Sequence, residues 1–404
     1  MTAASGRLAI ELDDGDERGR YHRQSLISWW DQDRLANARV LVVGAGALGN
    51  ELLKNLTLLG VGTIVVVDLD RVENSNLSRC VLFREDDEGR SKVEVAAQAA
   101  RRLNAGVRVI PVHGDVRTTI GLGAFAQFDV VLGGLDNREA RLHVNQCCWK
   151  TTTPWVDGAI EGLMGTVRVF EPPHSACYEC TMNARDFELL AARRACSLLT
   201  RDEMLGGKIP TTATSASIIA AMQVQEAVKL LHRDRIPATL SGKGVAYNGL
   251  THDSYVVSYG RQPHCLSHDT YELAGAVVAG EDATMGDILR SAGDGLPGAV
   301  LDLEREIVTA LCCASCGSSE DVFRPLDELS VADARCPGCG SERRPEVVHS
   351  IAGDDGALLA LTAGALGLPP LDVVTARSGE RRRHVLVRTP SDDALGALER
   401  DRVA

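Results

Sequence analysis

Three charged residues have the side chains that phosphate chemistry needs. Arg79 and Lys92 could neutralise the negative charge that develops on an α-phosphate and a departing pyrophosphate when ATP is cleaved. Asp136 could hold Mg²⁺, since this ion prefers one or two carboxylates together with phosphate oxygens. Taken singly, each residue is more often an ordinary surface charge. Together they favour cleavage of ATP over a dehydrogenase, which binds a pyrophosphate that is already made.

A glycine-rich turn precedes these charges. Residues 44–49, Gly-Ala-Gly-Ala-Leu-Gly, lie between an apolar run and an amphipathic stretch. This order predicts a buried strand, a turn and a helix start that presents backbone N–H groups to a phosphate. After the next strand, Asp68 and Asp70 follow at the ~20-residue interval expected of a ribose-binding carboxylate. The predicted nucleotide site comprises Gly44, Gly46, Ala47, Asp68, Asp70, Asn76, Arg79, Lys92, Asp136 and Asn137.

Together with residues 21–24 (Tyr-His-Arg-Gln), these motifs resemble those of the adenylating enzymes that activate ubiquitin-like proteins. That family includes the bacterial sulfur-carrier activators of the ThiF/MoeB/HesA type. The resemblance runs from about Tyr21 to about His268, with the motifs in the family's order. Three segments are closer to the eukaryotic activators than to the sulfur-carrier ones: residues 49–56, 157–162 and 176–181. Ala47 stands where many relatives have glycine, and only a backbone N–H is needed there.

The resemblance implies roles for two further residues. The family's entry-motif arginine reaches the nucleotide of a partner subunit, so Arg23 implies a homodimer with two composite sites. In the eukaryotic activators, the cysteine that accepts the modifier as a thioester lies where Cys196 lies here. The adjacent Arg193 and Arg194 would favour its thiolate, while a packed helical cysteine is the alternative. The predicted catalytic residues are Cys196, Arg23 and Asp136.

The sequence therefore predicts an ATP-dependent activating enzyme for a ubiquitin-like protein, with ATP and Mg²⁺ bound at one site. Adenylation of the modifier's C-terminus would precede thioester formation on Cys196 and transfer to a conjugating enzyme. One alternative is a sulfur-carrier-protein adenylyltransferase that forms no enzyme thioester. A second is a peptide-tailoring adenylating enzyme. A third is a non-catalytic scaffold subunit, against which Arg79, Lys92 and Asp136 argue.

Two Cys-x-x-Cys pairs, each followed by glycine, occur near the C-terminal end. Cys313 and Cys316 form the first pair, and Cys336 and Cys339 form the second. Each such turn directs two thiolates at one point, so the two pairs predict a closed Cys₄ zinc site of the zinc-ribbon type. A closed site has no open coordination position, which indicates a structural role.

A further pair, Cys177 and Cys180, predicts a second zinc site. The resembled activators often complete this pair with another Cys-x-x-Cys beyond the domain, and here that place holds Cys265 and His268. A Cys₃His set is acceptable to zinc. The alternative is that Cys265 and His268 are plain loop residues and the pair holds no metal. The expectation is two Zn²⁺ sites per chain.

The chain as a whole has the composition of a folded protein. It has 404 residues, 45% of them hydrophobic and 24% charged, and a net charge of −12. The acidic charge argues against a nucleic-acid partner, which would need a basic face. No run of ~18 apolar residues and no signal-peptide core appear, so no membrane span and a cytoplasmic location are expected.

The elements that must position these side chains alternate along the first two thirds of the chain. Strands predicted at 40–43, 63–67, 107–112 and 128–132 alternate with helical patterns. The fold class is therefore α/β, with a Rossmann-like adenylation domain on a mainly parallel sheet and a small α+β C-terminal domain that contains a zinc ribbon.

The expected division of the chain follows from these patterns and from the resemblance. Residues 1–20 are polar and acidic and are predicted to be a disordered lead. The adenylation domain is predicted at 21–270, with the catalytic-cysteine segment at about 181–212. A β-grasp-like domain is predicted at 271–404, with the ribbon at 311–343, a helix at 357–366 and a closing hairpin.

Overall fold

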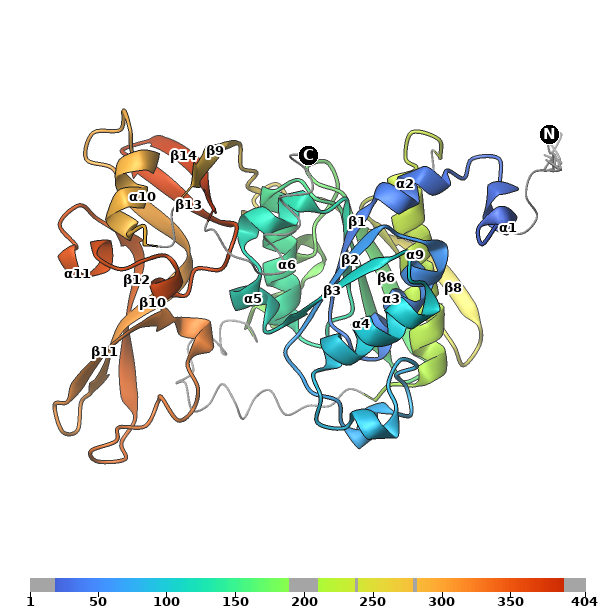
Figure 1. Cartoon of the computed structure of the whole chain (residues 1–404), viewed down its shortest axis with the longest axis horizontal. Helices are drawn as coiled ribbons and strands as arrows, with labels where there is room; N and C mark the ends of the chain where they lie inside the picture. Colours follow the sequence, from blue (N-terminus) through green and yellow to red (C-terminus); the bar gives the residue numbers. More distant parts are fainter. Residues whose placement is uncertain (1–18, 189–209, 237–238, 279–281, 389–404) are drawn as a thin grey trace.

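The computed structural model describes residues 19–188, 210–236, 239–278 and 282–388, and within them the chain forms two β-sheets (Figure 1). The expected lead at 1–20 lies almost wholly outside the described residues, as does Cys196. None of the helices in the described ranges is long and apolar enough to traverse a bilayer.

The first sheet has eight strands in the order β3-β2-β1-β4-β5-β6-β7-β8. The neighbours from β3 to β5 pair in parallel, and those from β5 to β8 pair antiparallel. The strands are β1 Arg39–Val43, β2 Thr63–Asp68, β3 Arg108–His113, β4 Val130–Gly133, β5 Trp155–Glu161, β6 Met164–Phe170, β7 Lys243–Asn248 and β8 Asp253–Ser258. The predicted Rossmann-like sheet is confirmed.

Helices cover both faces of this sheet because successive residues of its buried strands point to opposite sides. Val40 and Val42 of β1 face one core with α3, α4 and α9. Leu41 and Val43 face a second core with α5, α6 and a 3₁₀ segment. The helices are α1 His22–Ser25, α2 Gln32–Asn37, α3 Ala47–Leu59, α4 Lys92–Leu103, α5 Val116–Thr119, α6 Arg138–Lys150 and α9 Ala213–Leu231, and the 3₁₀ segment is Leu122–Gln127.

The second sheet has six strands. Its order is β11-β10-β13-β14-β9, with β12 paired to β10, and only β9 and β14 are parallel. The strands are β9 Leu273–Val278, β10 Val300–Cys313, β11 Ser319–Pro325, β12 Arg343–Ile351, β13 Asp372–Ser378 and β14 Arg381–Arg388, with the helices α10 Met285–Ala292 and α11 Gly356–Leu359. The expected equivalence of this domain to a β-grasp fold stays a prediction.

One sequence prediction about this domain is wrong. A single helix was expected at 357–366, but α11 ends at Leu359 and a separate 3₁₀ turn covers Gly364–Leu366. The backbone groups between them form hydrogen bonds with the start of α10 instead of within a helix. The Leu361 carbonyl accepts from Met285 N–H, and Thr362 forms a β-bridge with Thr284. Strand β10 is the longest strand of this sheet and runs from Val300 to Cys313, the first cysteine of the ribbon.

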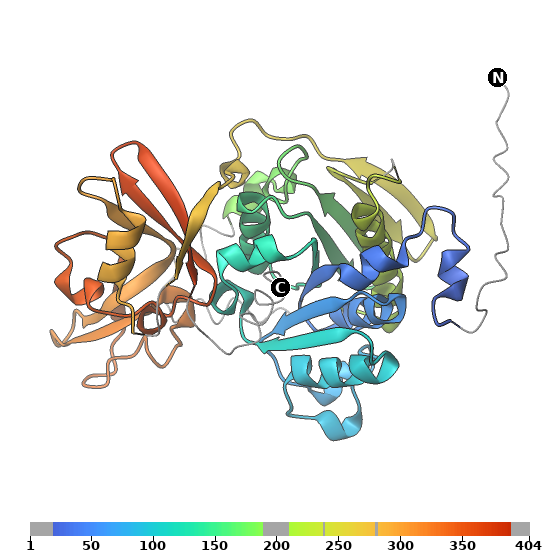
Figure 2. The same cartoon turned by 45° about the horizontal axis from the view of Figure 1, so that its top comes forward.

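The second domain packs on the side of the first that carries α5 and α6, opposite α1 and β8 (Figures 1 and 2). Leu371, Val373 and Leu386 join the core of the first domain on that side. The buried Asp372 accepts from Leu122 N–H at 3.0 Å and pairs with Arg305 at 2.9 Å. Apolar burial and the Leu122–Asp372 hydrogen bond therefore hold the two domains together, while the Arg305 pair fixes the Asp372 carboxylate within the second domain.

Candidate functional site

A pocket of about 710 Å³ opens at the carboxyl ends of β1, β2 and β4. Ligands bind at this edge in open α/β sheets because the connections to the helices diverge there. All ten residues of the predicted nucleotide site line this one pocket: Gly44, Gly46, Ala47, Asp68, Asp70, Asn76, Arg79, Lys92, Asp136 and Asn137. The structure thus brings together residues that span more than ninety positions of the chain.

The glycine turn joins β1 to α3 as expected. Gly44 has a backbone φ of +97°, a conformation that residues other than glycine adopt only at a cost in free energy. A Cβ at Gly44 would lie 2.6 Å from the Gly134 carbonyl oxygen, and a Cβ at Gly49 would lie 1.9 Å from the Gly44 carbonyl oxygen. A Cβ at Gly46 would meet no atom within 4 Å. Glycine is therefore needed at 44 and 49 for the fold, whereas at 46 it keeps the pocket open.

Asp68 braces this turn. Its two carboxylate oxygens accept from Ala45 N–H at 2.6 Å and from Asp70 N–H at 2.7 Å. Burial raises the pKa of the Asp68 carboxyl, and Lys92 offsets part of this effect. Lys92 pairs with Asp70 at 2.7 Å. Burial alone would lower the pKa of Lys92, but the charges of Asp68 and Asp70 outweigh burial and raise it.

Arg79 and Asn76 lie on the segment between β2 and α4. Arg79 is half-buried and donates from Nη1 to the Ser75 carbonyl at 2.5 Å. Asn76 is buried, and its Oδ1 accepts from Glu73 N–H at 3.0 Å. Asn76 therefore shapes the 3₁₀ turn that brings Arg79 to the pocket, a structural task that the sequence did not indicate.

Asp136 and Asn137 lie where β4 leads into α6. Asn137 caps the helix, accepting from Ala140 N–H at 2.7 Å. Asp136 is exposed at the pocket, and Asn137 Nδ2 donates to its Oδ1 at 3.4 Å. An exposed carboxylate next to the turn that would hold phosphates fits a Mg²⁺–nucleotide complex, because such a complex needs one or two carboxylates and open positions for phosphate oxygens.

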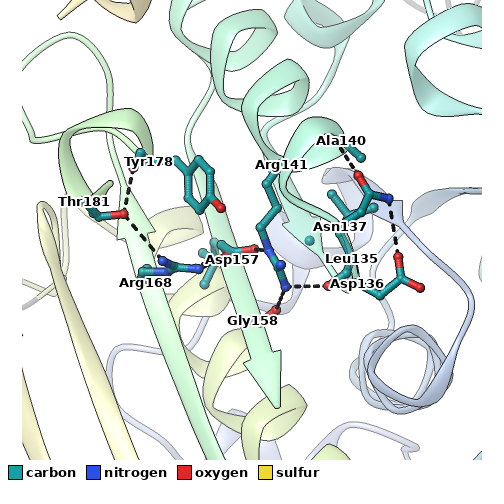
Figure 3. Close-up of polar contacts among 12 residues, drawn as sticks. Leu135, Asp136, Asn137, Ala140, Arg141, Asp157, Gly158, Arg168, Tyr178 and Thr181 are labelled. Carbon is teal, nitrogen blue, oxygen red and sulfur yellow. Dashed lines mark hydrogen bonds and ion pairs between the residues drawn. The ribbon is translucent and has the colours of Figure 1, made fainter. Parts of the chain in front are cut away.

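Sequence reasoning missed a buried ionic network behind Asp136 (Figure 3). Asp157 has no exposed surface and pairs with both Arg141 and Arg168. Arg141 lines the pocket and also donates to the Leu135 carbonyl. The sequence held two signals: this aspartate follows the apolar Trp155 and Val156, and it begins the segment 157–162 that resembles the eukaryotic activators.

A second missed residue is Asn50, at the start of α3. It is fully buried, and its Nδ2 donates to the Ala45 carbonyl at 2.7 Å while its Oδ1 accepts from Leu82 N–H at 2.9 Å. Asn50 therefore ties the glycine turn to the segment that follows Arg79.

Of the three predicted catalytic residues, Asp136 is the one that the described part of the chain places at the pocket. Arg23 is exposed on α1 and is not among the residues that line the cavity, so a role at the nucleotide of its own chain is not supported. Cys196 lies outside the described residues. The flanks of its segment are described: Asp186 pairs with Arg138 at 3.2 Å beside Asn137, and Thr211 lines the pocket.

The predicted ribbon cysteines meet at one point. The ligand atoms of Cys313, Cys316, Cys336 and Cys339 lie within 4.8 Å of one another. Sγ–Sγ distances are 3.5 Å for Cys313–Cys339 and 3.6 Å for Cys316–Cys336. Four thiolates at ~2.3 Å from a tetrahedral zinc would be roughly 3.8 Å apart. The cluster thus fits Zn²⁺.

Cys177, Cys180, Cys265 and His268 form the second cluster as predicted. The Cys177–Cys265 sulfurs are 3.5 Å apart, and Cys180 Sγ is 3.3 Å from His268 Nε2. Zinc at Nε2 would leave the proton on Nδ1, which now accepts from the exposed Arg261 at 3.2 Å. The four ligand types and distances fit Zn²⁺, with Arg261 displaced.

Two other cysteines are poor nucleophiles in this structure. Cys80 lines the pocket, but burial raises the pKa of its thiol to about 11. Cys147 contacts His143 at 3.5 Å, yet burial raises the pKa of this thiol to about 12 and lowers the pKa of His143 to about 3. Neither thiol carries the charge that nucleophilic attack at neutral pH requires.

Comparisons with known proteins place this site in context. "SUMO-activating enzyme subunit 2" from Dictyostelium discoideum is 40% identical over 149 residues, 37% of this chain and 22% of that protein. "Adenylyltransferase and sulfurtransferase MOCS3-1" from Zea mays is 32% identical over 250 residues, 61% of this chain and 50% of that protein. The chain therefore matches half or less of the length of these curated relatives.

A solved structure supports the fold. E. coli MccB with ATP superposes with a TM-score of 0.52 at 23% identity, over 63% of this chain and 75% of that one. The model of the ThiF family matches residues 21–267. That range contains the glycine turn, the pocket and the Cys177 pair, and it is more than half of the sequence. The chain belongs to the ThiF family.

Proposed function

We propose that the chain uses ATP to adenylate the C-terminal carboxylate of a ubiquitin-like protein. The observation that carries this proposal is the convergence of the glycine turn, Arg79, Lys92 and Asp136 on one pocket of a ThiF-family chain. A pocket that only held a finished dinucleotide would have little use for this added charge.

In the proposed reaction, a carboxylate oxygen of the modifier attacks the α-phosphorus of ATP. The bond from that phosphorus to the bridging oxygen breaks, and pyrophosphate leaves with the electron pair. Arg79 and Lys92 stabilise the charge on the phosphoryl oxygens. Asp136 would hold Mg²⁺, which supplies further neutralisation of the phosphates.

The wall of the pocket formed by the antiparallel strands favours a polypeptide acceptor. Met164 and Tyr255 line the pocket, and both are exposed. Val256 is also exposed, and Leu250, between β7 and β8, is 73% exposed. Exposed apolar side chains such as Met164 and Tyr255 at the wall of the pocket support the binding of a protein there. A modifier seated there would direct its C-terminal tail toward the nucleotide.

The second proposed step transfers the modifier to Cys196. Its thiolate attacks the carbonyl carbon of the acyl-adenylate, the bond from that carbon to the AMP oxygen breaks, and AMP leaves. The flanks of the Cys196 segment at Asp186 and Thr211 lie beside the pocket, which supports this assignment. The buried, protonated Cys80 is a poorer acceptor.

The remaining parts of the proposal concern assembly. Arg23 would reach the pocket of a second copy in a homodimer, consistent with its exposure away from its own pocket. The C-terminal domain would hold a conjugating enzyme. The two cysteine clusters would bind one structural zinc ion each, since neither has an open position.

A sulfur-carrier adenylyltransferase is the second candidate. The match to the Zea mays adenylyltransferase and sulfurtransferase is the longer of the two curated matches described above and favours it. The two candidates share the adenylation step and differ at Cys196. The two candidates are separated by incubating the chain with ATP and a small β-grasp protein encoded by a neighbouring reading frame. A covalent thioester adduct of that protein on Cys196 favours the activating enzyme.

The test of adenylation is ATP–pyrophosphate exchange with that modifier. Asp136→Ala should lower exchange at least about tenfold, ~1.4 kcal/mol of barrier, and a smaller loss would remove Asp136 from the metal role. Cys196→Ala should keep exchange but lose a thiol-sensitive band with the modifier. Persistence of that band would place the acceptor elsewhere, and unchanged turnover without any band would favour the sulfur-carrier candidate.

A further inference from the structure

The buried carboxylate of Asp157 lies between two guanidinium groups. Arg141 Nε donates to one of its oxygens at 2.9 Å, and Arg168 Nε donates to the other at 3.0 Å (Figure 3). Asp157 has no exposed surface, and Arg141 is 8% exposed. Burial of such ions costs more than their attraction returns unless the geometry is well satisfied, so a network of this kind is weak evidence for stability alone.

The second set of contacts made by Arg141 indicates what the network does. Its Nη2 donates to the Leu135 carbonyl and, at 3.1 Å, to the Gly158 carbonyl. Leu135 directly precedes Asp136. One guanidinium therefore links the loop that carries Asp136 to strand β5, and Asp157 fixes the orientation of that guanidinium.

The opposite oxygen of Asp157 is held just as firmly. Arg168 contacts it through both Nε and Nη2, and its guanidinium lies 5.0 Å from the centre of the Tyr178 ring. Asp157 therefore cannot turn away from Arg141 without losing its contacts on the other side. A carboxylate clamped from both sides is suited to hold a partner side chain in one rotamer.

We infer that Asp157 is a positioning residue for metal-dependent nucleotide binding: it holds Arg141, which holds the Leu135 carbonyl, which sets the position of Asp136. The inference rests on the proposed role of Asp136 as a Mg²⁺ ligand. Loss of Asp157 should therefore weaken the contribution of Mg²⁺ to nucleotide affinity, and not only the stability of the fold.

The test measures the affinity for α,β-methylene-ATP by isothermal titration calorimetry, once in excess Mg²⁺ and once in EDTA. The dissociation constant in EDTA divided by the dissociation constant in Mg²⁺ gives the factor by which the metal strengthens binding. Asp157→Asn, a nearly isosteric change, should reduce this ratio about tenfold, toward the value of Asp136→Ala, while the affinity in EDTA changes much less. A purely structural defect would weaken both affinities by the same factor.

Asp372→Asn is the matched control, because Asp372 is also fully buried and paired with an arginine but lies at the domain interface. Its ratio should equal that of the wild type. If Asp157→Asn does not fold, Arg141→Lys decides, since lysine keeps the charge but cannot bridge Asp157 and Leu135 with one planar group.

If Asp157→Asn has the same ratio of dissociation constants as the wild type, the inference is wrong. If Asp157→Asn does not fold, the same result in Arg141→Lys overturns it. An equal fall in Asp372→Asn overturns it as well. If Mg²⁺ does not change the affinity of the wild-type protein for α,β-methylene-ATP, that result would instead refute the metal role of Asp136 in the proposed function. The two failures are therefore distinguishable.

Discussion

Replacing Gly44 by alanine should destabilise the first domain by an amount that follows from its backbone. The φ of +97° lies beyond the usual left-handed region, and holding a side chain there costs about 1–3 kcal/mol. The new Cβ would also lie 2.6 Å from the Gly134 carbonyl oxygen, which is backbone and cannot rotate away. With the steric contact added to the strain, the combined loss should be roughly 2–4 kcal/mol, which lowers the melting temperature of a domain of this size by roughly 4–16 °C.

Gly46→Ala is the contrasting variant within the same turn. Gly46 has an ordinary φ of −72°, and its Cβ would meet no protein atom within 4 Å. The free energy of unfolding should therefore stay the same or rise by about 0.4–1 kcal/mol, because alanine lowers the conformational entropy of the unfolded chain. Because Gly46 lines the pocket, however, the methyl group should occupy space that a phosphate needs and weaken the binding of α,β-methylene-ATP by at least about tenfold.

The two variants are compared by differential scanning calorimetry and by titration with the nucleotide analogue. Gly44→Ala should lose stability, whereas Gly46→Ala should lose binding and keep stability. If Gly44→Ala melts within about 1 °C of the wild type, or if Gly46→Ala is as unstable as Gly44→Ala, the reasoning from the turn geometry is wrong.

Three further predictions concern the cysteine clusters, the proposed homodimer and the interface between the domains. Metal analysis should return two zinc ions per chain, and Cys265→Ser and Cys339→Ser should each remove one; a single zinc unaffected by Cys265→Ser would leave only the ribbon site. Arg23→Ala and Asp136→Ala subunits should recover part of the exchange activity when mixed, because heterodimers contain one intact composite site; dimers without recovery would contradict this. Asp372→Asn should lower the free energy of unfolding by about 1–3 kcal/mol by breaking a buried ion pair, as measured in urea, and no change would show that the Asp372–Arg305 pair contributes no net stability.

The convergence of the ten predicted residues on one pocket could be predicted because several of them follow directly after predictable strands. Gly44, Asp68 and Asp136 each lie just beyond a short apolar run, and the carboxyl ends of parallel strands meet at one edge of the sheet. Local pattern and topology therefore sufficed, although whether these residues bind nucleotide stays a prediction.

The network behind the pocket could not be predicted in the same way. Asp157 and Arg141 are 16 positions apart on a strand and a helix, and their pairing depends on how α6 packs against β5. The helix expected at 357–366 was wrong for a related reason, because contacts of Leu361 and Thr362 with distant residues outweigh local helix propensity. The Cys₃His cluster joins halves 88 positions apart, and only the family resemblance connected them.

Helix α6 is shared by two neighbourhoods. Arg141, Asn145 and Trp149 form one stripe at a spacing of four residues: Arg141 contacts Asp157, Asn145 accepts from Tyr178 N–H, and Trp149 stacks on His268. This stripe runs from the nucleotide pocket to the Cys₃His cluster.

Another stripe of α6 faces the second domain. Leu142, His143, Gln146 and Lys150 line a 290 Å³ cavity between the domains, and Lys150 pairs with Glu304. A saturation scan of α6 should therefore give two interleaved periodicities, one in nucleotide and metal affinity and one in the docking of the C-terminal domain. Because the two stripes together occupy much of the helix, a substitution in α6 should disturb either the pocket side or the domain contact, so its sequence is constrained for two unrelated reasons at once.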